Sequence, residues 1–139
     1  MIVLDTNVIS ELMKPAPADA VVRWIAGQPA VALYTTNLTQ ADILHGILLL
    51  PTGKRRGALE AAAEAMFAED FDGRVLPFGS EAAPAYAQIA AQRRRLGRPI
   101  SQFDAQIAAI ARSVRSPVAT RNVSDFEDCG VDVLDPWKA

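Results

Sequence analysis

Four aspartates of the 139-residue chain stand where a carboxylate can do chemistry. Asp5 and Asp125 follow short apolar runs, whereas Asp42 and Asp104 open apolar stretches with helical spacing. A group of carboxylates is stable only if positive charge lies between them, because like charges repel. A divalent cation with oxygen ligands supplies such charge. The four acids therefore point to a metal site, provided that the fold brings them together.

Each acid also has an interpretation that needs no ligand. Asp5 is suited to cap a helix that follows it, because its side chain can accept backbone N–H groups. Asp42 and Asp104 each follow a hydroxyl residue by three positions, Thr39 and Ser101, which resembles a capping box with Asp in place of Glu. Asp125 is suited to a turn. Taken singly, these structural interpretations are the more common ones, and it is the four acids together that favour a site.

The hydrophobic pattern predicts an α/β domain in which strands and helices alternate. We expect one domain over residues 1–139, with a mainly parallel five-stranded sheet flanked by helices. Ligands in open α/β sheets bind beyond the carboxyl ends of the strands, where Asp5 and Asp125 would lie. The predicted strands are 1–4, 31–34, 74–76, 117–119 and 131–134. The predicted helices are 7–13, 18–25, 39–50, 57–71, 82–96 and 101–114.

Composition excludes several classes of protein. Half of the residues are hydrophobic and 22% are charged, which suffices for a packed core. The single cysteine, Cys129, excludes a disulfide framework, and the single histidine, His45, excludes a site with two imidazoles. The formal net charge of −2 argues against binding nucleic acid by bulk charge. Without a basic leader or an apolar run near the ~20 residues of a membrane helix, we expect a cytoplasmic domain.

Four blocks of sequence, in order along the whole chain, resemble PIN-domain ribonucleases of the VapC/FitB type, the toxins of bacterial toxin–antitoxin pairs. The blocks are residues 5–12, 39–46, 97–109 and 119–127, and Asp135-Pro136-Trp137 follows them. The resemblance implies a three-layer fold with a parallel sheet between helices. It also implies Mg²⁺- or Mn²⁺-dependent cleavage of RNA, a chemistry that carboxylates around a metal ion can support.

The same resemblance implies roles for the acids. Asp5 and Asp104 match the two central metal-binding acids of the family, and Asp125 and Asn122 lie in the motif that supplies a late polar group. Asp42 stands where the family usually has Glu. Because its side chain is one methylene shorter, we expect it to act on the metal through a water molecule.

Other polar residues are candidates for positioning and for substrate contact. Thr6 and Asn7 would orient Asp5, and Ser101 stands at the start of the helix that carries Asp104. Arg98 leads into that same helix, so we expect it at the rim of the site, in contact with RNA phosphates. The basic runs 54–56 and 93–95 are either solvated helix faces or further phosphate contacts. His45, one helical turn after Asp42, is expected to be a packed or partly exposed side chain rather than a metal ligand.

The resemblance further implies partners, namely a second copy of the chain and a small antitoxin whose C-terminal segment lies over the site. Trp24 and the apolar early helices are suited either to the core or to a groove for such a partner helix. An alternative function remains open: a PIN-fold binding module with weak or lost cleavage that acts with its antitoxin in operator regulation. The replacement of the usual Glu by Asp42 favours this alternative.

Two other α/β classes share part of this pattern, one through an aspartate after the first strand and the other through an acidic Mg²⁺ pocket. A haloacid-dehalogenase-type phosphatase needs a second Asp two residues further on, where this chain has Asn7. A response-regulator receiver needs a lysine late in the sheet, and none of the three lysines, Lys14, Lys54 and Lys138, follows a suitable strand. The sequence therefore disfavours both classes.

Overall fold

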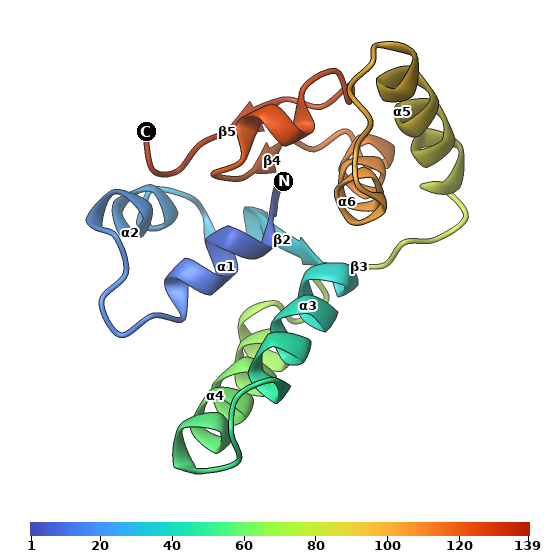
Figure 1. Ribbon diagram of the computed structural model, residues 1–139. Coiled ribbons are helices and arrows are strands. Elements are labelled where there is room, and N and C mark those ends of the chain that lie inside the picture. The colour runs from blue at the N-terminus through green and yellow to red at the C-terminus, as the bar shows by residue number, and fades with distance from the viewer.

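A computed structural model describes residues 1–139 and shows five parallel strands in one sheet (Figure 1). The strand order is β3-β2-β1-β4-β5, and every neighbouring pair is parallel, so the predicted α/β fold is confirmed. β1 occupies the centre because its residues are apolar on both faces, as buried parallel strands require. The strands are β1 (Ile2–Leu4), β2 (Leu33–Thr36), β3 (Val75–Leu76), β4 (Val118–Ala119) and β5 (Val133–Leu134).

All six predicted helices are present, with ends that differ from the prediction by a few residues. They are α1 (Thr6–Leu12), α2 (Asp19–Ala26), α3 (Asn37–Leu48), α4 (Lys54–Ala65), α5 (Ala83–Arg95) and α6 (Gln102–Ser113). Short 3₁₀ turns, η1 (Ala30–Ala32) and η3 (Val123–Phe126), precede β2 and follow β4. A π-helical turn, η2 (Met66–Asp70), continues α4. None of the helices combines the length and the apolar character that crossing a lipid bilayer requires.

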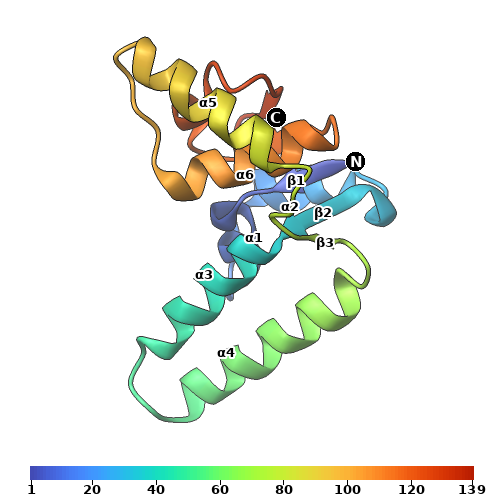
Figure 2. The same cartoon turned by 90° about the vertical axis from the view of Figure 1, so that its right-hand side faces the viewer.

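The sheet separates two hydrophobic cores, because successive strand residues point to opposite faces. Val3 and Val118 belong to one core, and their neighbours Leu4 and Ala119 belong to the other. α5 and α6 cover the first core, and α1 to α4 cover the second, which gives the expected three layers. In two orthogonal views α5 and α6 lie on one side of the sheet, while α3 and α4 project from the other side as a helical pair (Figures 1 and 2).

The segment between β2 and α3 differs from the prediction in a way that changes the site. The predicted strand 31–34 begins two residues later and runs to Thr36, so that Thr35 and Thr36 are fully buried. Thr36 then caps α3, and its hydroxyl accepts the Thr39 N–H at 3.1 Å. The predicted capping box from Thr39 to Asp42 is therefore wrong. β-Branched threonines fit a strand, and the hydroxyl that ends the strand also starts the helix.

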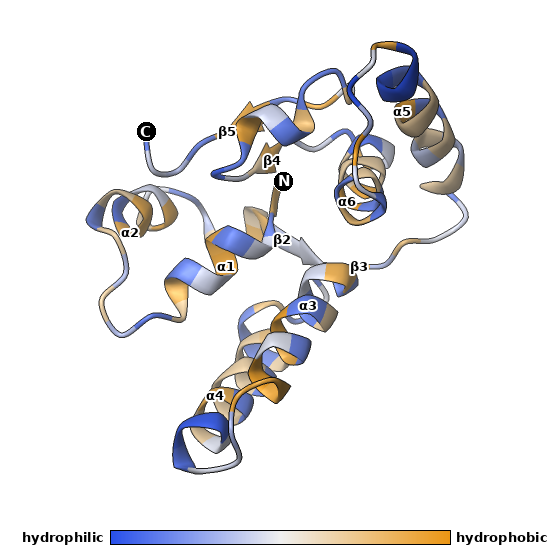
Figure 3. Ribbon diagram, viewed as in Figure 1, coloured by the Kyte–Doolittle hydropathy of each residue, from blue (hydrophilic) through white to orange (hydrophobic).

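Hydropathy follows this layered arrangement (Figure 3). The strands are apolar or neutral, and the C-terminal end of α5 is strongly hydrophilic where Arg93, Arg94 and Arg95 follow one another. Arg94 and Arg95 are exposed, but Arg93 is only 6% exposed and belongs to the interior. Cys129 fills space in the first core, and Trp24 packs against the second.

Candidate active site

A cavity of about 450 Å³ opens at the carboxyl ends of β1 and β4. Three of the four predicted acids line it, namely Asp5, Asp42 and Asp104. They come from three different elements, the end of β1, the middle of α3 and the first turn of α6. The other polar residues that line it are Thr6, Asn7, Ser10, Glu11, Lys14, Arg121 and Asn122. We refer to this cavity as the acidic pocket.

Asp5 is held in one orientation at the end of β1. Its side chain is the N-cap of α1 and accepts the Thr6 N–H at 2.8 Å. The Thr120 hydroxyl donates to its other oxygen at 2.8 Å, and Asn7 Nδ2 donates to that oxygen at 3.3 Å. Burial raises the pKa of Asp5, the hydrogen bonds from Thr120 and Thr6 oppose the rise, and the charges of Asp104 and Asp125 add to it. The capping interpretation is therefore correct, and it is compatible with a place in the acidic pocket.

Asp104 lies in the first turn of α6, where Ser101 is the N-cap as predicted. The Ser101 hydroxyl accepts the Asp104 N–H at 3.1 Å, which leaves the Asp104 carboxylate directed to the pocket. Burial raises the pKa of Asp104, hydrogen bonding with Ser101 lowers it, the charge of Asp125 raises it and the charge of Arg93 lowers it. Both central acids thus have raised pKa values because each is partly buried beside other carboxylates.

Thr120 is a polar residue of the site that sequence reasoning did not single out. It is fully buried directly after β4, and its hydroxyl accepts from Asn7 Nδ2 and from the Asn122 N–H, both at 3.1 Å. Because Leu4 pairs with Ala119 across β1 and β4, the residues that follow them, Asp5 and Thr120, become neighbours. A polar residue directly after each of two adjacent parallel strands is the signal that identifies such a pair.

Asn7 and Thr6 behave differently although both are adjacent to Asp5 in sequence. Asn7 contacts Asp5 through its amide, and its Oδ1 accepts the Arg121 N–H at 3.2 Å, which ties α1 to the loop after β4. Thr6 contacts Asp5 only through its backbone N–H, and its hydroxyl lies 3.2 Å from that of Thr39 on α3. Asn7 therefore fixes the carboxylate of Asp5, whereas Thr6 links α1 to α3.

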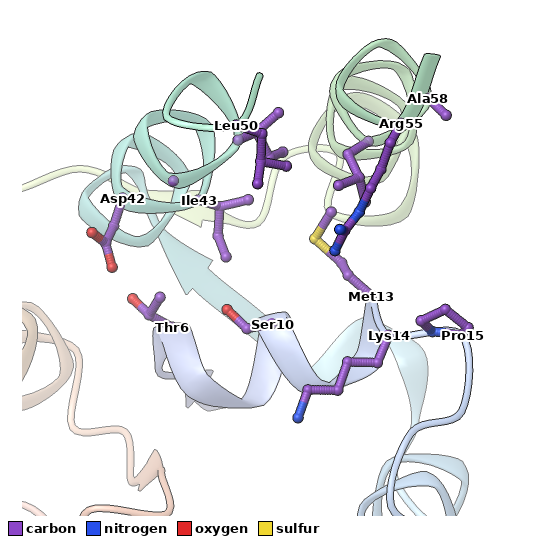
Figure 4. Close-up of a pocket in the computed structure, with 13 residues that line it drawn as sticks. Thr6, Ser10, Met13, Lys14, Pro15, Asp42, Ile43, Leu50, Arg55 and Ala58 are labelled. Atoms are coloured by element: carbon purple, nitrogen blue, oxygen red, sulfur yellow. The ribbon is translucent and has the colours of Figure 1, made fainter. Parts of the chain in front are cut away.

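Asp42 is exposed and accepts no hydrogen bond, so its carboxylate is not occupied in capping. It projects from α3 toward Thr6 of α1 and also lines a second cavity of about 640 Å³ (Figure 4). This second cavity lies between α1, α3 and α4, and we refer to it as the clip groove. Its apolar residues are Met13, Pro15, Ile43, Ile47, Leu50, Ala58 and Leu59. The neighbouring His45 is exposed and lines neither cavity.

Asn122 lines the acidic pocket, but Asp125 is exposed in η3 and acts on the pocket only through its charge. The loop that carries both is fixed by Arg93. Its guanidinium donates to the Asp125 carbonyl at 2.9 Å, to the Glu127 carbonyl at 3.0 Å and to the Arg98 carbonyl at 2.8 Å. The prediction that residues 93–95 form a solvated or phosphate-binding run is therefore wrong for Arg93.

Arg98, which was predicted at the rim of the site, is paired with acidic side chains. Arg98 forms ion pairs with Glu127, at 3.0 Å, and with Asp128, and it does not line the acidic pocket. The cations of the pocket are Lys14 and Arg121, neither of which was predicted as a site residue. Sequence spacing does not reveal them, because they reach the site from the end of α1 and from the loop after β4.

No three carboxylate, imidazole or thiol side chains are grouped closely enough to hold a metal ion among themselves. The carboxylates of Asp5 and Asp104 line the same cavity, and the charge of Asp104 raises the pKa of Asp5. A site with two carboxylates leaves most of a coordination sphere for water and for substrate oxygens. Magnesium is commonly bound in that way.

This fold and this pocket define a class of protein. The family model of the PIN domain matches residues 2–130, so the chain belongs to the PIN-domain family. It is 43% identical to VapC ribonuclease Y4jK of Sinorhizobium fredii and 38% identical to toxin FitB of Neisseria gonorrhoeae, over 99% of each chain in both comparisons. The structure of FitAB bound to an IR36 DNA fragment matches with a TM-score of 0.93 and 38% identity, over 99% of this chain and 96% of that one. The chain is a PIN-domain toxin of the VapC/FitB type, as the sequence resemblance implied.

Proposed function

We propose that this ribonuclease toxin hydrolyses RNA phosphodiester bonds in the acidic pocket, with Mg²⁺ or Mn²⁺ held by Asp5 and Asp104. The observation that carries the proposal is that these two carboxylates, from β1 and α6, share one cavity while their pKa values are raised by burial and by neighbouring negative charge. A cation between them would stabilise both in the charged form. The relatives named as ribonucleases support RNA as the substrate class.

The donor set fits a hard divalent cation. It consists of oxygen atoms, and two carboxylates with room for water and phosphate oxygens suit Mg²⁺ better than a closed set of protein ligands would. When bound, the cation supplies an activated water and offsets the charge on the phosphate. The protein positions Asp5 through Thr120, Asn7 and the Thr6 N–H, and it positions Asp104 through the Ser101 cap.

We assign supporting roles to the other two acids and to Asn122. Asp42 is exposed to the pocket and free of hydrogen bonds, so it can orient a water molecule near the cation rather than bind the cation directly. Asp125 adds negative charge at the same edge of the sheet, and Asn122 offers an amide to the substrate or to water. Arg98 has no role in this scheme, because its charge is already matched by Glu127 and Asp128.

Cleavage of RNA at increasing Mg²⁺ concentration tests the proposal, with Asp5→Asn and Asp104→Asn as the variants. Each should lower cleavage by at least about 100-fold, because the loss of residues that merely support a ligand already costs about 10- to 100-fold. Asp72→Asn is the matched control, since Asp72 is exposed and lies outside the acidic pocket. Undiminished cleavage in EDTA, or full activity of both variants, would contradict the proposal.

We also propose that a small antitoxin occupies the clip groove and that the toxin forms a homodimer in the cytoplasm. The groove has apolar walls and shares Thr6, Ser10, Lys14 and Asp42 with the acidic pocket, so a helix seated in it would cover the site. Matched toxin and antitoxin should co-purify, and Leu50→Asp, at a half-buried residue of the groove outside both cores, should abolish that association while the toxin stays folded. If Leu50→Asp leaves association intact, the antitoxin does not use the clip groove.

The alternative function, a binding module with weak or lost cleavage that regulates its operator with the antitoxin, predicts a different result. The exposed position of Asp42 and the absence of a closed group of three ligands favour it. Under this alternative the toxin–antitoxin complex binds operator DNA while the free toxin leaves RNA intact at every metal concentration. The cleavage assay therefore separates the two functions.

A further inference from the structure

The acidic pocket contains two cations, and only one of them is free to meet a ligand. Lys14 Nζ lies 2.9 Å from Glu11 Oε1, and Glu11 is buried with its other oxygen accepting the Ala18 N–H at 3.0 Å. The positive charge of Lys14 is therefore matched within the protein. Arg121 is exposed, forms no ion pair and donates no hydrogen bond from its side chain.

Arg121 is nevertheless held in place by an aromatic ring. Its guanidinium carbon lies 5.1 Å from the centroid of the Trp137 ring, a cation–π contact. Trp137 is itself fixed, because it packs against the second core, follows the buried Pro136 and donates its backbone N–H to Asp135 Oδ1 at 2.9 Å. Such a contact uses the face of the guanidinium and leaves the N–H groups at its edge available.

We propose that Arg121 is the phosphate-binding group of this site and that Trp137 is the residue that positions it. The assignment rests on the proposed function and names how the RNA backbone is held beside the scissile bond. A pocket with four nearby acids repels phosphate, and the net charge of −2 gives no bulk attraction. An arginine that is pre-oriented and unpaired binds phosphate through two parallel N–H groups. Arg121 is the pocket residue that meets this description.

The substitution Arg121→Gln isolates the guanidinium. The backbone N–H of Arg121 keeps its bond to Asn7 Oδ1, so the link between α1 and the loop after β4 does not depend on this side chain. We expect the KM for a single-stranded RNA to rise by about 10- to 100-fold, the usual value of a charge-assisted hydrogen bond, while kcat stays within about twofold. The negative slope of log(kcat/KM) against log[NaCl] should become shallower by about 0.7, as the loss of one phosphate contact requires.

The positioning role of Trp137 is tested by its effect on Arg121. Trp137→Leu should raise KM in the same direction, and Trp137→Phe should restore most of the loss, because a phenyl ring retains the cation–π contact. In the Trp137→Leu background the further change Arg121→Gln should cost less than it does in the wild type. Arg94→Gln is the matched control, since Arg94 is exposed on α5 outside the pocket and the change in net charge is the same.

Binding gives a second readout that does not depend on turnover. The chain has two tryptophans, so Trp24→Phe leaves Trp137 as the only indole. In that background, with Asp104→Asn added so that the RNA is not cleaved during the titration, oligouridylate and oligoadenylate 12-mers should change the fluorescence of Trp137 equally, and Arg121→Gln should weaken both responses equally. A loss confined to one base would show that Arg121 reads a base, and an unchanged KM with unchanged binding would show that it touches no RNA. Either result overturns the assignment while leaving metal-dependent cleavage intact, whereas loss of cleavage in the wild type would overturn the proposed function itself.

Discussion

Replacing Thr120 with valine removes one hydroxyl group from beneath the acidic pocket and leaves the shape of the side chain unchanged. Thr120 is fully buried, and its hydroxyl donates to Asp5 Oδ2 at 2.8 Å while it accepts from Asn7 Nδ2 and from the Asn122 N–H. Asn7 keeps its bond to Asp5, and Asn122 is exposed to water. The uncompensated loss is therefore the bond to the Asp5 carboxylate.

That loss sets the expected magnitude. A hydrogen bond to a charged group contributes about 1.5–3 kcal/mol, so Thr120→Val should lower the free energy of unfolding by about 2 kcal/mol near neutral pH. The hydroxyl stabilises the ionised form and lowers the pKa of Asp5 against the opposing effect of burial. The stability difference is therefore present above the pKa of Asp5 and is lost as the pH falls through it. Because Asp5 is then less well oriented, the Mg²⁺ concentration for half-maximal cleavage should rise by about 10- to 100-fold.

Urea unfolding at several pH values and a Mg²⁺ titration of RNA cleavage measure the two effects. Thr120→Ser is the matched control, since it keeps the hydroxyl and loses only a methyl group. If Thr120→Val unfolds at the same urea concentration as the wild type and needs no more Mg²⁺, the hydroxyl does not hold Asp5. A stability loss that is independent of pH would show that the role of Thr120 is packing and not stabilisation of a charge.

Three further predictions concern Asp42, Arg93 and toxicity in cells. Asp42→Ala should lose less activity than Asp104→Ala. Asp42→Glu should need no more Mg²⁺ than the wild type, because the longer side chain brings its carboxylate closer to the metal ion; a higher Mg²⁺ requirement in a metal titration would contradict this. Arg93→Met should lower the free energy of unfolding by about 3 kcal/mol, because three carbonyl groups lose their charged donor, while Arg94→Met should change it little in urea unfolding. Induced expression of the chain alone should arrest growth, and co-expression of its antitoxin should restore it; normal growth at high expression would argue against a toxin.

The fold could be predicted from the sequence because the local patterns agree with the tertiary structure. The run Ile2–Leu4 is apolar on both faces, and only a buried central strand satisfies that pattern. The end of β2 could not be predicted, because Thr35 and Thr36 are polar and resemble a turn. They are buried because each hydroxyl has a partner, the Leu4 carbonyl at 3.0 Å for Thr35 and the Thr39 N–H for Thr36.

Only part of the candidate site could be predicted. Asp5, Asp42 and Asp104 line one pocket because each stands at an element boundary or on a helix that the pattern identifies. Arg93 was misassigned because a run of arginines carries no information about which member turns inward. The guanidinium of Arg93 is buried by carbonyls from a loop more than thirty residues further along the chain. Contacts of that kind depend on the tertiary fold and leave no local pattern.

The contact between Arg121 and Trp137 likewise depends on the tertiary fold and leaves no local pattern in the sequence. The two residues are sixteen positions apart in loops after β4 and β5, and their contact follows from the parallel pairing of those strands. Aromatic residues are only 6% of the chain, so composition gives no sign that two of them line the site. The structure places both Phe103 and Trp137 on the wall of the acidic pocket.

The most direct test of the central claim is Mg²⁺-dependent RNA cleavage by the purified chain and by its Asp104→Asn variant, with folding verified by thermal unfolding. Metal binding by Asp5 and Asp104 predicts cleavage that saturates with Mg²⁺, disappears in EDTA and falls by at least about 100-fold in the folded variant. Cleavage that persists in EDTA, or a folded Asp104→Asn variant that cuts RNA as fast as the wild type at every Mg²⁺ concentration, would contradict it.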